Sequence, residues 1–439
     1  MEILVKAAQF FLSLSILVIL HELGHFTFAK IFKTRVEKFY VFFNPWFSIF
    51  KFKRGETEYG LGWLPLGGYV KIAGMIDESM DTEQMKKPPQ PWEFRSKPAW
   101  QRLLIMIGGV LVNVILALFI YSAVLYTWGD EYLATKNMKY GVVCDSLAQN
   151  LGFRNGDKIL TVSGHEVENF QKIAHDILLN DDRTVKVLRN NDTVTVSIPN
   201  DVVGQLVKNP ILFIPRFPFI VDKVISGNTA EKAGFQKDDE LIGINGSPAK
   251  FFDEFKDSLK SNEGKSITIT VKRAEVPVDI NFLVPNDGII GVQSVSDITR
   301  FFEINHKQYT FIQSIPAGIK RGYATIVSYL KQLKLIFNPK AKAYESLGGF
   351  ITIGKIFPGV WDWQSFWGLT AFLSIILAIM NMLPIPALDG GHVLFLLYEI
   401  ITRRKPSDKF LEYAQIIGIM LLLALLVYAN ANDVIRLFK

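Results

Sequence analysis

Four stretches of the chain are apolar over a length close to that of a membrane-spanning helix. They run from Ala7 to Phe28, Leu103 to Trp128, Phe366 to Ile385 and Leu411 to Tyr428. A helix crosses the hydrocarbon core of a bilayer with ~20 residues, so each stretch predicts a transmembrane helix. The long section between the second and third stretches has the pattern of a soluble insertion instead.

The soluble section contains two copies of one pattern. Residues Ser146 to Phe170 align with Asn228 to Phe252 at a constant offset of 82 residues. Each copy predicts a short helix ending in A-x-x-x-G-F, then a strand and turn, then an amphipathic helix. The copies resemble the bacterial PDZ domain. This resemblance implies binding of peptide C-termini by strand addition, and a role as spacers or as a lid stays open.

Three further segments have patterns that fit a membrane surface. Thr57 to Lys71 combines aromatic and β-branched residues with Gly and Pro, and it predicts an irregular strand pair. Ile319 to Phe337 has apolar residues spaced at three and four, and it predicts an amphipathic helix along the external surface. Its apolar face would pack on the spans or contact substrate. Ser346 to Phe357 is too short to cross and predicts a loop or a re-entrant segment.

Composition agrees with a membrane protein that carries a large soluble part. Of 439 residues, 49% are hydrophobic and 21% are charged. The net charge of +6 follows from topology and indicates no nucleic-acid partner. The chain has one cysteine, Cys144, which excludes an intrachain disulfide and is interpreted as a buried structural thiol.

Lys and Arg residues predict the orientation in the membrane. Between Lys30 and Arg102 there are 13 basic residues against 8 acidic ones, and the turn after the third span carries Arg403, Arg404 and Lys405. Positively charged loops stay in the cytoplasm, so both connections should be cytoplasmic. The two termini and the soluble section then lie on the opposite side.

The first apolar stretch contains the pattern H-E-x-x-H, from His21 to His25. On a helix the two histidines are one turn apart and face the same way, so their imidazoles can hold one Zn²⁺. Glu22 is then placed to take a proton from a water activated by the metal. Charged residues are costly at membrane depth, which favours a functional interpretation.

A second polar cluster closes the third apolar stretch, where Asn381 to His392 reads N-M-L-P-I-P-A-L-D-G-G-H. Two prolines break the helix there. The carboxylate of Asp389 can be a third zinc ligand that leaves a fourth position for water. Alternatively, Asp389 caps a helix that begins near Gly391. No local pattern decides between these roles, and His392 is assigned none.

Together these motifs resemble the site-2 protease family, peptidase family M50. The resemblance rests on H-E-L-G-H, on P-L-G-G-Y-V-K from Pro65 to Lys71, on the PDZ-like copies and on N-x-x-P-x-P-x-L-D-G-G, in the order of the regulator of sigma-E protease type. It implies that His21, His25 and Asp389 bind Zn²⁺ and that Glu22 is the catalytic base. It also implies substrate binding by residues that include Asn381 and the glycine-rich β-region, namely Gly60, Leu61, Gly62, Gly67 and Gly68.

The resemblance further implies the reaction and its partners. The enzyme would cleave single-span membrane proteins, such as anti-sigma factors, inside the bacterial inner membrane after another protease has cut them externally. The PDZ-like copies would test the size of the external part of the substrate.

Some relatives have a Gly-rich turn where this chain has Phe42 to Pro45, so the function of that turn is not carried over. The alternatives are a scaffold that tethers partners without proteolysis and an anchored protease acting on external proteins. The second alternative conflicts with the predicted topology.

The predicted fold class is therefore a multi-pass α-helical membrane protein with four transmembrane helices, a membrane-associated β-region and two extracytoplasmic α+β PDZ-like domains. The predicted parts are the first helix 1–33, the cytoplasmic β-region 34–100, the second helix 101–128, the PDZ-like domains 129–210 and 211–300, an external helix and loop 301–363, the third helix 364–392, and a cytoplasmic turn with the fourth helix 393–439.

Overall fold

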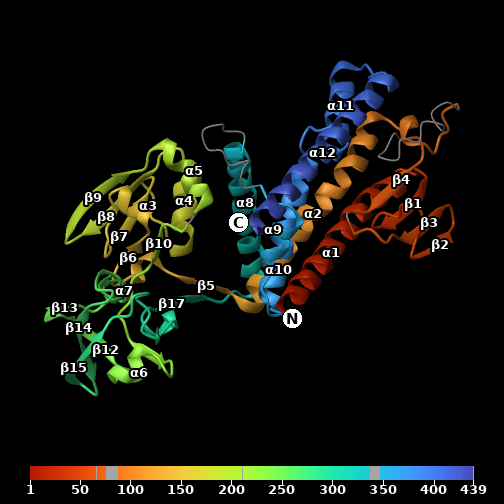
Figure 1. The fold of residues 1–439 in the computed structure, drawn as a ribbon. Helices are drawn as coiled ribbons and strands as arrows, with labels where there is room; N and C mark the ends of the chain where they lie inside the picture. The colour runs from red at the N-terminus through yellow and green to blue at the C-terminus, as the bar shows by residue number, and fades with distance from the viewer. Residues whose placement is uncertain (66, 76–87, 210, 337–346, 439) are drawn as a thin grey trace. The chain divides into compact units, whose positions relative to one another are not determined.

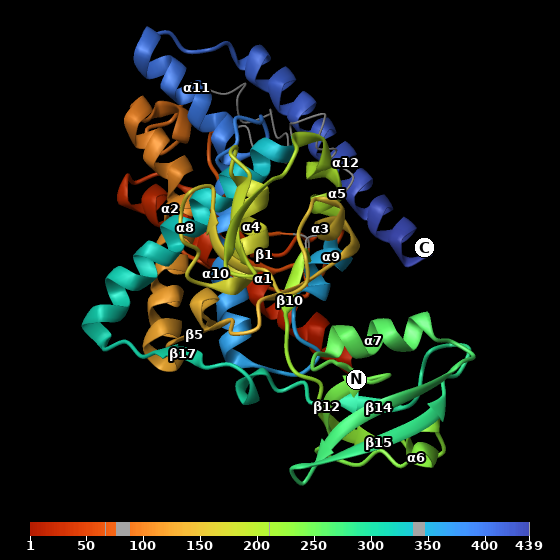
Figure 2. The same ribbon diagram turned by 90° about the vertical axis from the view of Figure 1, so that its left-hand side faces the viewer.

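The computed structural model describes residues 1–65, 67–75, 88–209, 211–336 and 347–438. The chain divides into two compact units. The first, the helical unit, consists of Met1–Gly129 and the C-terminal part from Gln308. The second, the β-rich unit, is Asp130–Lys307. Figures 1 and 2 show the elements of both units.

Among the described residues, four helices are long and apolar enough to cross a membrane. They are α1 (Glu2–Ile31), α2 (Ala99–Trp128), α10 (Trp363–Asn381) and α12 (Asp408–Leu437). Their positions match the four apolar stretches, although α10 ends earlier than the sequence predicts. Pro384 and Pro386 follow that end, and proline cannot continue a helix because it lacks the N–H group.

Helix α2 is the centre of the helical unit and packs against α1, α10, α8 and α11. Two buried polar contacts join the spans. Thr370 on α10 donates a hydrogen bond to Ser13 on α1 at 3.0 Å, and Ser374 on α10 donates to the Asn113 carbonyl on α2 at 2.8 Å. Such contacts satisfy polar groups at a depth where water is scarce.

The amphipathic segment forms α8 (Phe311–Ile336), which is longer than the sequence predicts at its N-terminal end. Gly318 faces Ser122 and Gly322 faces Leu118, so the helix packs closely along α2. Of the two predicted roles of this helix, packing on the spans or contact with substrate, the described part of α8 packs on a span. The next segment contains the short helix α9 (Phe350–Lys355). Residues 337 and 346, at the edges of the two predicted segments, lie outside the described residues.

The predicted third helix, 364–392, is two helices, because α11 (Asp389–Thr402) follows a reversal of the chain after α10. Residues 393–402, which were predicted to lie with the cytoplasmic turn, belong to α11, and Arg403, Arg404 and Lys405 come after it. Gly390 and Gly391 allow the reversal, because a Cβ at either position would lie within 2.6 Å of a carbonyl oxygen from Leu383 or Ile385. The apolar residues that follow then pack against α2.

The β-region is a four-stranded sheet with the order β2-β3-β1-β4. Its strands are β1 (Val36–Val41), β2 (Phe50–Arg54), β3 (Thr57–Leu61) and β4 (Tyr69–Ile72). Strand β1 pairs with β3 in parallel and with β4 antiparallel. The two edges are therefore β2, which is exposed along its length, and β4, which contacts α1. Residues 76–87, within the predicted region 34–100, lie outside the described part.

The β-rich unit has two lobes, each with its own hydrophobic core. The first lobe contains α3 (Ser146–Asn150), β7 (Lys158–Val162), α4 (Ile173–Leu179), β8 (Thr184–Arg189) and β9 (Asp192–Ser197). The second contains α6 (Thr229–Ala233), β12 (Glu240–Ile244), α7 (Phe252–Ser261), β14 (Ser266–Arg273) and β15 (Val276–Leu283). These elements follow one another in the same order in both lobes, and the second lobe has one additional short strand, β13 (Ser247–Pro248), between β12 and α7.

Each lobe has the same buried ion pair. Asp157 accepts two hydrogen bonds from Arg189, at 2.8 and 2.7 Å, and Asp239 accepts two from Arg273, both at 2.7 Å. The same two arginines also donate to the carbonyls of Gly152 and Gly234. Asp157 and Asp239 are 82 residues apart, the offset of the sequence pattern.

The lobes meet later in the chain than the boundary between residues 210 and 211 suggests. Strand β10 (Phe213–Pro215) pairs with β6 (Val142–Cys144) of the first lobe, and Phe213 is buried in its core. After the second lobe, β17 (Ile304–Lys307) pairs with β5 (Asp130–Leu133). The boundaries of the two lobes therefore follow from strand pairing and not from the repeated sequence pattern.

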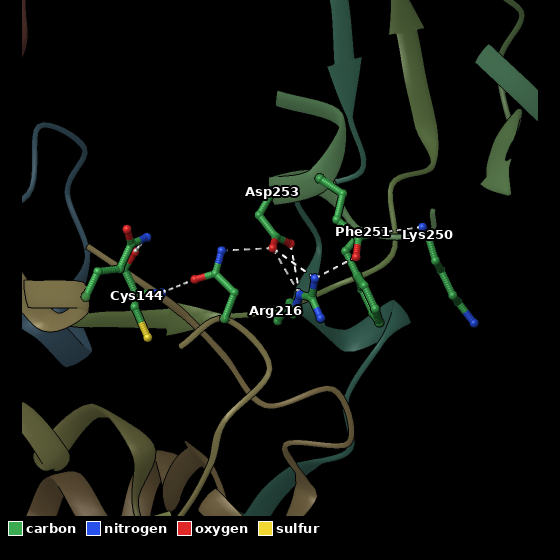
Figure 3. A network of polar contacts seen from close by, with 8 residues as sticks. Cys144, Arg216, Lys250, Phe251 and Asp253 are labelled. Atoms are coloured by element: carbon green, nitrogen blue, oxygen red, sulfur yellow. Dashed lines mark hydrogen bonds and ion pairs between the residues drawn. The ribbon is translucent and has the colours of Figure 1, made fainter. Parts of the chain in front are cut away.

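A polar network joins the lobes (Figure 3). Asp253, at the start of α7, accepts hydrogen bonds from Arg216 at 3.0 Å and from Asn155 of the first lobe at 3.1 Å. Asn155 in turn accepts from the backbone N–H of Cys144 at 2.8 Å. The Arg216 guanidinium also lies over the Phe251 ring, 3.9 Å from its centroid. One buried carboxylate thus connects both lobes and the segment between them.

Candidate metal centre

The two histidines of the H-E-x-x-H pattern lie on one face of α1 and are buried. Their Nε2 atoms are 3.3 Å apart, and the rings are nearly perpendicular with centroids 4.9 Å apart. This follows from the helical period, which places residues four apart on the same side. Both rings therefore present a nitrogen to the same point.

Asp389 completes a group of three candidate ligands. Its Oδ2 lies 3.3 Å from Nε2 of His21 and 3.4 Å from Nε2 of His25. This oxygen is buried, and it has no hydrogen-bond partner among the residues that the structure describes. Three candidate ligand atoms thus lie 3.3–3.4 Å from one another, which is the convergence expected around a cation. Two imidazoles and one carboxylate fit Zn²⁺ and leave a coordination position for water or substrate.

The structure does not use Asp389 as a helix cap. Helix α11 begins at Asp389, its N-cap is Leu388, and no side chain caps it. Helix α12 holds the preceding loop, because Ala387, at a φ of 79°, donates its N–H to Gln415 at 3.1 Å. Gly418 lies so close that a Cβ there would be 1.7 Å from the Pro386 carbonyl oxygen. The fourth span therefore determines where the Asp389 carboxylate lies.

Helix α2 forms the wall behind the histidines. His25 donates from Nδ1 to the Ile105 carbonyl at 2.8 Å, and the Asn113 amide nitrogen lies 3.2 Å from Nδ1 of His21. Between them, a Cβ on Gly109 would lie 2.5 Å from Nε2 of His25. The sequence patterns did not predict a role for these residues. The available signal was a polar residue, Asn113, inside an apolar span.

A cavity of about 440 Å³ opens onto this centre. Glu22 lines it beside His21, His25 and Asp389, so the proposed base shares the space with all three candidate ligands. Asn381 lines it too, and its amide nitrogen lies 3.1 Å from Nε2 of His21. The walls also contain His392 and Gln415, for which the sequence predicted no role.

The edge strand β4 forms another wall of this cavity. Gly67, Gly68, Tyr69, Val70 and Ile72 line it. A Cβ on Gly68 would lie 2.7 Å from Val18 and 3.3 Å from Glu22, so the chain passes close to α1 here. The backbone N–H of Val70 faces the Glu22 carboxylate. The edge strand of the described sheet and the candidate base therefore border the same space.

The structure does not bring the other three predicted substrate-binding residues to this cavity. Gly60, Leu61 and Gly62 are at the end of β3, which pairs with β2 on one side and β1 on the other. A Cβ on Gly60 would lie 2.3 Å from the Tyr40 ring, and one on Gly62 would lie 2.2 Å from the Phe43 carbonyl oxygen. Packing inside the sheet accounts for both glycines.

Comparison with known proteins extends these observations to the whole chain. Residues 9–425 match peptidase family M50. A Haemophilus influenzae protein named regulator of sigma E protease is 28% identical, with 100% of both chains covered. Proteins named as zinc metalloproteases in Vibrio cholerae and Neisseria meningitidis are 27% and 28% identical. These alignments cover 99% and 98% of this chain and 100% and 98% of the relatives. The family match spans most of the chain, so the chain belongs to peptidase family M50 and is a zinc metalloprotease of the membrane.

Proposed function

We propose that this zinc metalloprotease cleaves single-span membrane proteins within the membrane, with His21, His25 and Asp389 as its zinc ligands and Glu22 as its general base. The observation that carries the proposal is the shared cavity, in which three converging ligand atoms, one further carboxylate and the edge strand β4 lie together. A tethering scaffold would need none of these.

The chemistry follows from the positions of the side chains. Zinc held by the three ligands would act as a Lewis acid towards the scissile carbonyl and the attacking water. Glu22 takes the proton of that water and then delivers it to the leaving amine. Asn381 presents an amide N–H₂ beside the histidines, where it would donate a hydrogen bond to the substrate carbonyl.

Substrate binding would use β4. A peptide bond inside a helix is shielded, so the substrate must be unwound before water reaches it. The edge strand β4 (Tyr69–Ile72) would then hold the extended segment by strand addition next to Glu22. Gly67 and Gly68 would keep the entrance to this edge free of side chains, whereas Gly60, Leu61 and Gly62 do not line the cavity and have no part in this proposal.

The wider biological setting is part of this proposal. The distribution of Lys and Arg favours a bacterial inner-membrane protein with its active site towards the cytoplasm and the β-rich unit outside. We propose that the two lobes are PDZ domains, which have the matching element order described above. They would exclude substrates with large external domains. The name of the Haemophilus influenzae relative, regulator of sigma E protease, supports anti-sigma factors as substrates.

The test uses the purified full chain in lipid vesicles with a single-span substrate already shortened outside. Glu22→Gln should keep one zinc per chain and lose cleavage, because it removes the base but no ligand. His21→Ala, His25→Ala and Asp389→Ala should each lose most of the zinc.

Full zinc content in Asp389→Ala, measured by elemental analysis, would contradict the ligand assignment. Cleavage by Glu22→Gln at the parent rate would contradict the role of Glu22. In cells, truncated single-span proteins that accumulate with Glu22→Gln would identify the substrates.

A further inference from the structure

Three residues spaced four apart on α2 face the candidate ligands of α1. The Ile105 carbonyl accepts a hydrogen bond from His25, Gly109 lies against both imidazoles, and Asn113 lies beside His21. A spacing of four places Ile105, Gly109 and Asn113 in one row along the helix surface. This row lies against both histidines.

The chemistry of imidazole determines what such a row can do. A neutral imidazole binds a metal through the nitrogen that has no proton, and its other nitrogen carries the proton. That N–H group needs an acceptor when it is buried. The Ile105 carbonyl can only accept, so the 2.8 Å contact places the proton of His25 on Nδ1. Nε2 of His25 is then free to face Asp389.

His21 has the same requirement, and Asn113 is the group that can meet it. The amide nitrogen of Asn113 lies 3.2 Å from Nδ1 of His21. The amide oxygen is buried and has no hydrogen-bond partner among the described residues. The two ends of an amide have nearly the same shape, so exchanging them places the oxygen against Nδ1. An acceptor there is what an Nδ1 proton requires.

We propose that Asn113 is a positioning residue for the metal centre, whose Oδ1 accepts the Nδ1 proton of His21 and so directs Nε2 towards the metal. The inference rests on the proposed assignment of His21 and His25 as ligands. Asn113 is fully buried, and its own carbonyl accepts a hydrogen bond from Ser374 on α10. Asn113 therefore has little freedom to move, and its hydrogen bond would restrain the orientation of the His21 ring.

Gly109 supports the same interpretation. A Cβ at this position would lie 2.7 Å from Cε1 of His21 as well as 2.5 Å from Nε2 of His25. Real Cβ atoms do not approach other atoms this closely, so any larger residue would push both rings away from α2. Absence of a side chain at Gly109 thus lets Ile105 and Asn113 reach the two Nδ1 atoms.

The experiment measures metal binding by the full chain in detergent. Zinc affinity is obtained by competition with a chelator, and the visible spectrum of the Co²⁺-substituted protein reports ligand geometry. Asn113→Leu removes the acceptor with little change in size, and Asn113→Asp keeps an acceptor oxygen. Thr370→Val is the matched control, because Thr370 is equally buried and hydrogen-bonded between spans but does not touch a histidine.

We expect Asn113→Leu to weaken zinc binding about 10- to 100-fold, the usual effect of losing a hydrogen bond to a ligand, and to shift the Co²⁺ spectrum. Asn113→Asp should restore both towards the parent values, and Thr370→Val should change neither. Zinc affinity unchanged in Asn113→Leu would overturn the proposal. Equal damage from Asp and Leu would overturn it as well, because Asn113 would then donate rather than accept.

Two additions keep the result interpretable. If Asn113→Leu does not fold, Asn113→Ala removes the same acceptor without bulk and is compared with Asn113→Asp. His21→Ala is measured in the same series. Full zinc binding by His21→Ala would show that the ligand assignment itself is wrong, whereas loss of zinc there with parent affinity in Asn113→Leu would reject only the role of Asn113.

Discussion

Gly24 on α1 and Gly108 on α2 lie backbone to backbone, because a Cβ on Gly24 would be only 2.3 Å from the Gly108 carbonyl oxygen. Gly24 lies within the H-E-x-x-H pattern, between the two candidate histidine ligands. This contact therefore decides how near the histidines come to α2, where the Ile105 carbonyl accepts from His25. Close approach of small residues is a common basis of helix association in membranes.

Gly24→Ala should loosen the metal centre. The added methyl group meets backbone that cannot rotate away, so α1 and α2 must separate, at a cost of about 1–3 kcal/mol. We expect a lower melting temperature and weaker zinc binding. Gly368→Ala on α10 is the control, since nothing lies within 4 Å of its added Cβ and helix propensity favours alanine. Equal stability and zinc affinity in the two variants would show that this contact is not tight.

Gln415→Leu should weaken zinc binding indirectly, through the loop that carries Asp389. The substitution leaves the buried Ala387 N–H without its acceptor, which costs about 1–3 kcal/mol. The loop that carries Asp389 should then become more mobile, with zinc affinity reduced by about tenfold, equivalent to 1.4 kcal/mol. Chelator competition measures this change. Met420→Leu, on an exposed face of the same helix, should bind zinc as the parent does. If both variants keep the parent affinity, α12 does not hold the loop.

Asp253→Ala should separate the two lobes of the β-rich unit. It removes the buried carboxylate that accepts from both Arg216 and Asn155, and breaking a buried ion pair costs up to about 3–5 kcal/mol. Hydrogen exchange of the intact protein should become faster around Arg216 and at the start of α7. Asp238→Ala breaks an exposed pair with Arg300 and should cost about 0–1 kcal/mol. Similar exchange in both variants would mean that the network does not hold the lobes together.

Cys144 should be unreactive in the folded protein. Burial, aided by the Asp157 and Asp145 carboxylates, raises the pKa of its thiol to about 12. At pH 8 only about one thiol in 10⁴ would be the reactive thiolate. Alkylation should therefore be slow until the lobe unfolds, whereas Ser407→Cys in a Cys144→Ser chain should react rapidly. Fast alkylation of native Cys144 at pH 8 would contradict this environment.

The same thiol makes stability depend on pH. Its pKa in the folded chain lies above the ordinary value of 9.0, so the folded chain keeps the proton over a range where the unfolded chain releases it. This contribution to stability is fully present below about pH 9 and is lost as pH rises towards 12. Cys144→Ser should remove that part of the pH dependence in denaturant titrations of the β-rich unit within the full chain.

Cysteine labelling tests the proposed topology. In a Cys144→Ser chain, Lys53→Cys and Ser407→Cys should react with an impermeant reagent only after the membrane is opened. Ser247→Cys should react in intact spheroplasts. All three positions are exposed, so accessibility across the membrane decides the outcome. Labelling of Lys53→Cys from outside would invert the proposed orientation.

Local patterns predicted a large part of this protein. The four spans follow from the length and apolarity of their segments, and the position of His21 and His25 on one face follows from the helical period. The matching halves of the β-rich unit follow from an alignment at a constant offset. Each of these inferences needs only residues that are close in sequence, or a direct comparison of two segments.

Other features depended on contacts between distant segments. The sequence favoured a glycine-rich stretch that includes Gly60 to Gly68 for substrate binding. Which part of it lies at the edge of the sheet depends on strand order, and among the described strands that order places β3 inside and β4 at the edge. The predicted third helix is divided into α10 and α11, because Gly390 and Gly391 let the chain reverse against its own carbonyls.

The sequence by itself determined which residue types are available for zinc chemistry and which two histidines share a helix face. Only the tertiary structure decided that Asp389 meets them, that Asn113 lies behind His21 and that α12 holds the loop before Asp389. The reason is physical. Helical periodicity is set by local hydrogen bonds, whereas contacts between spans depend on how closely particular side chains allow two backbones to approach, as at Gly24 and Gly108.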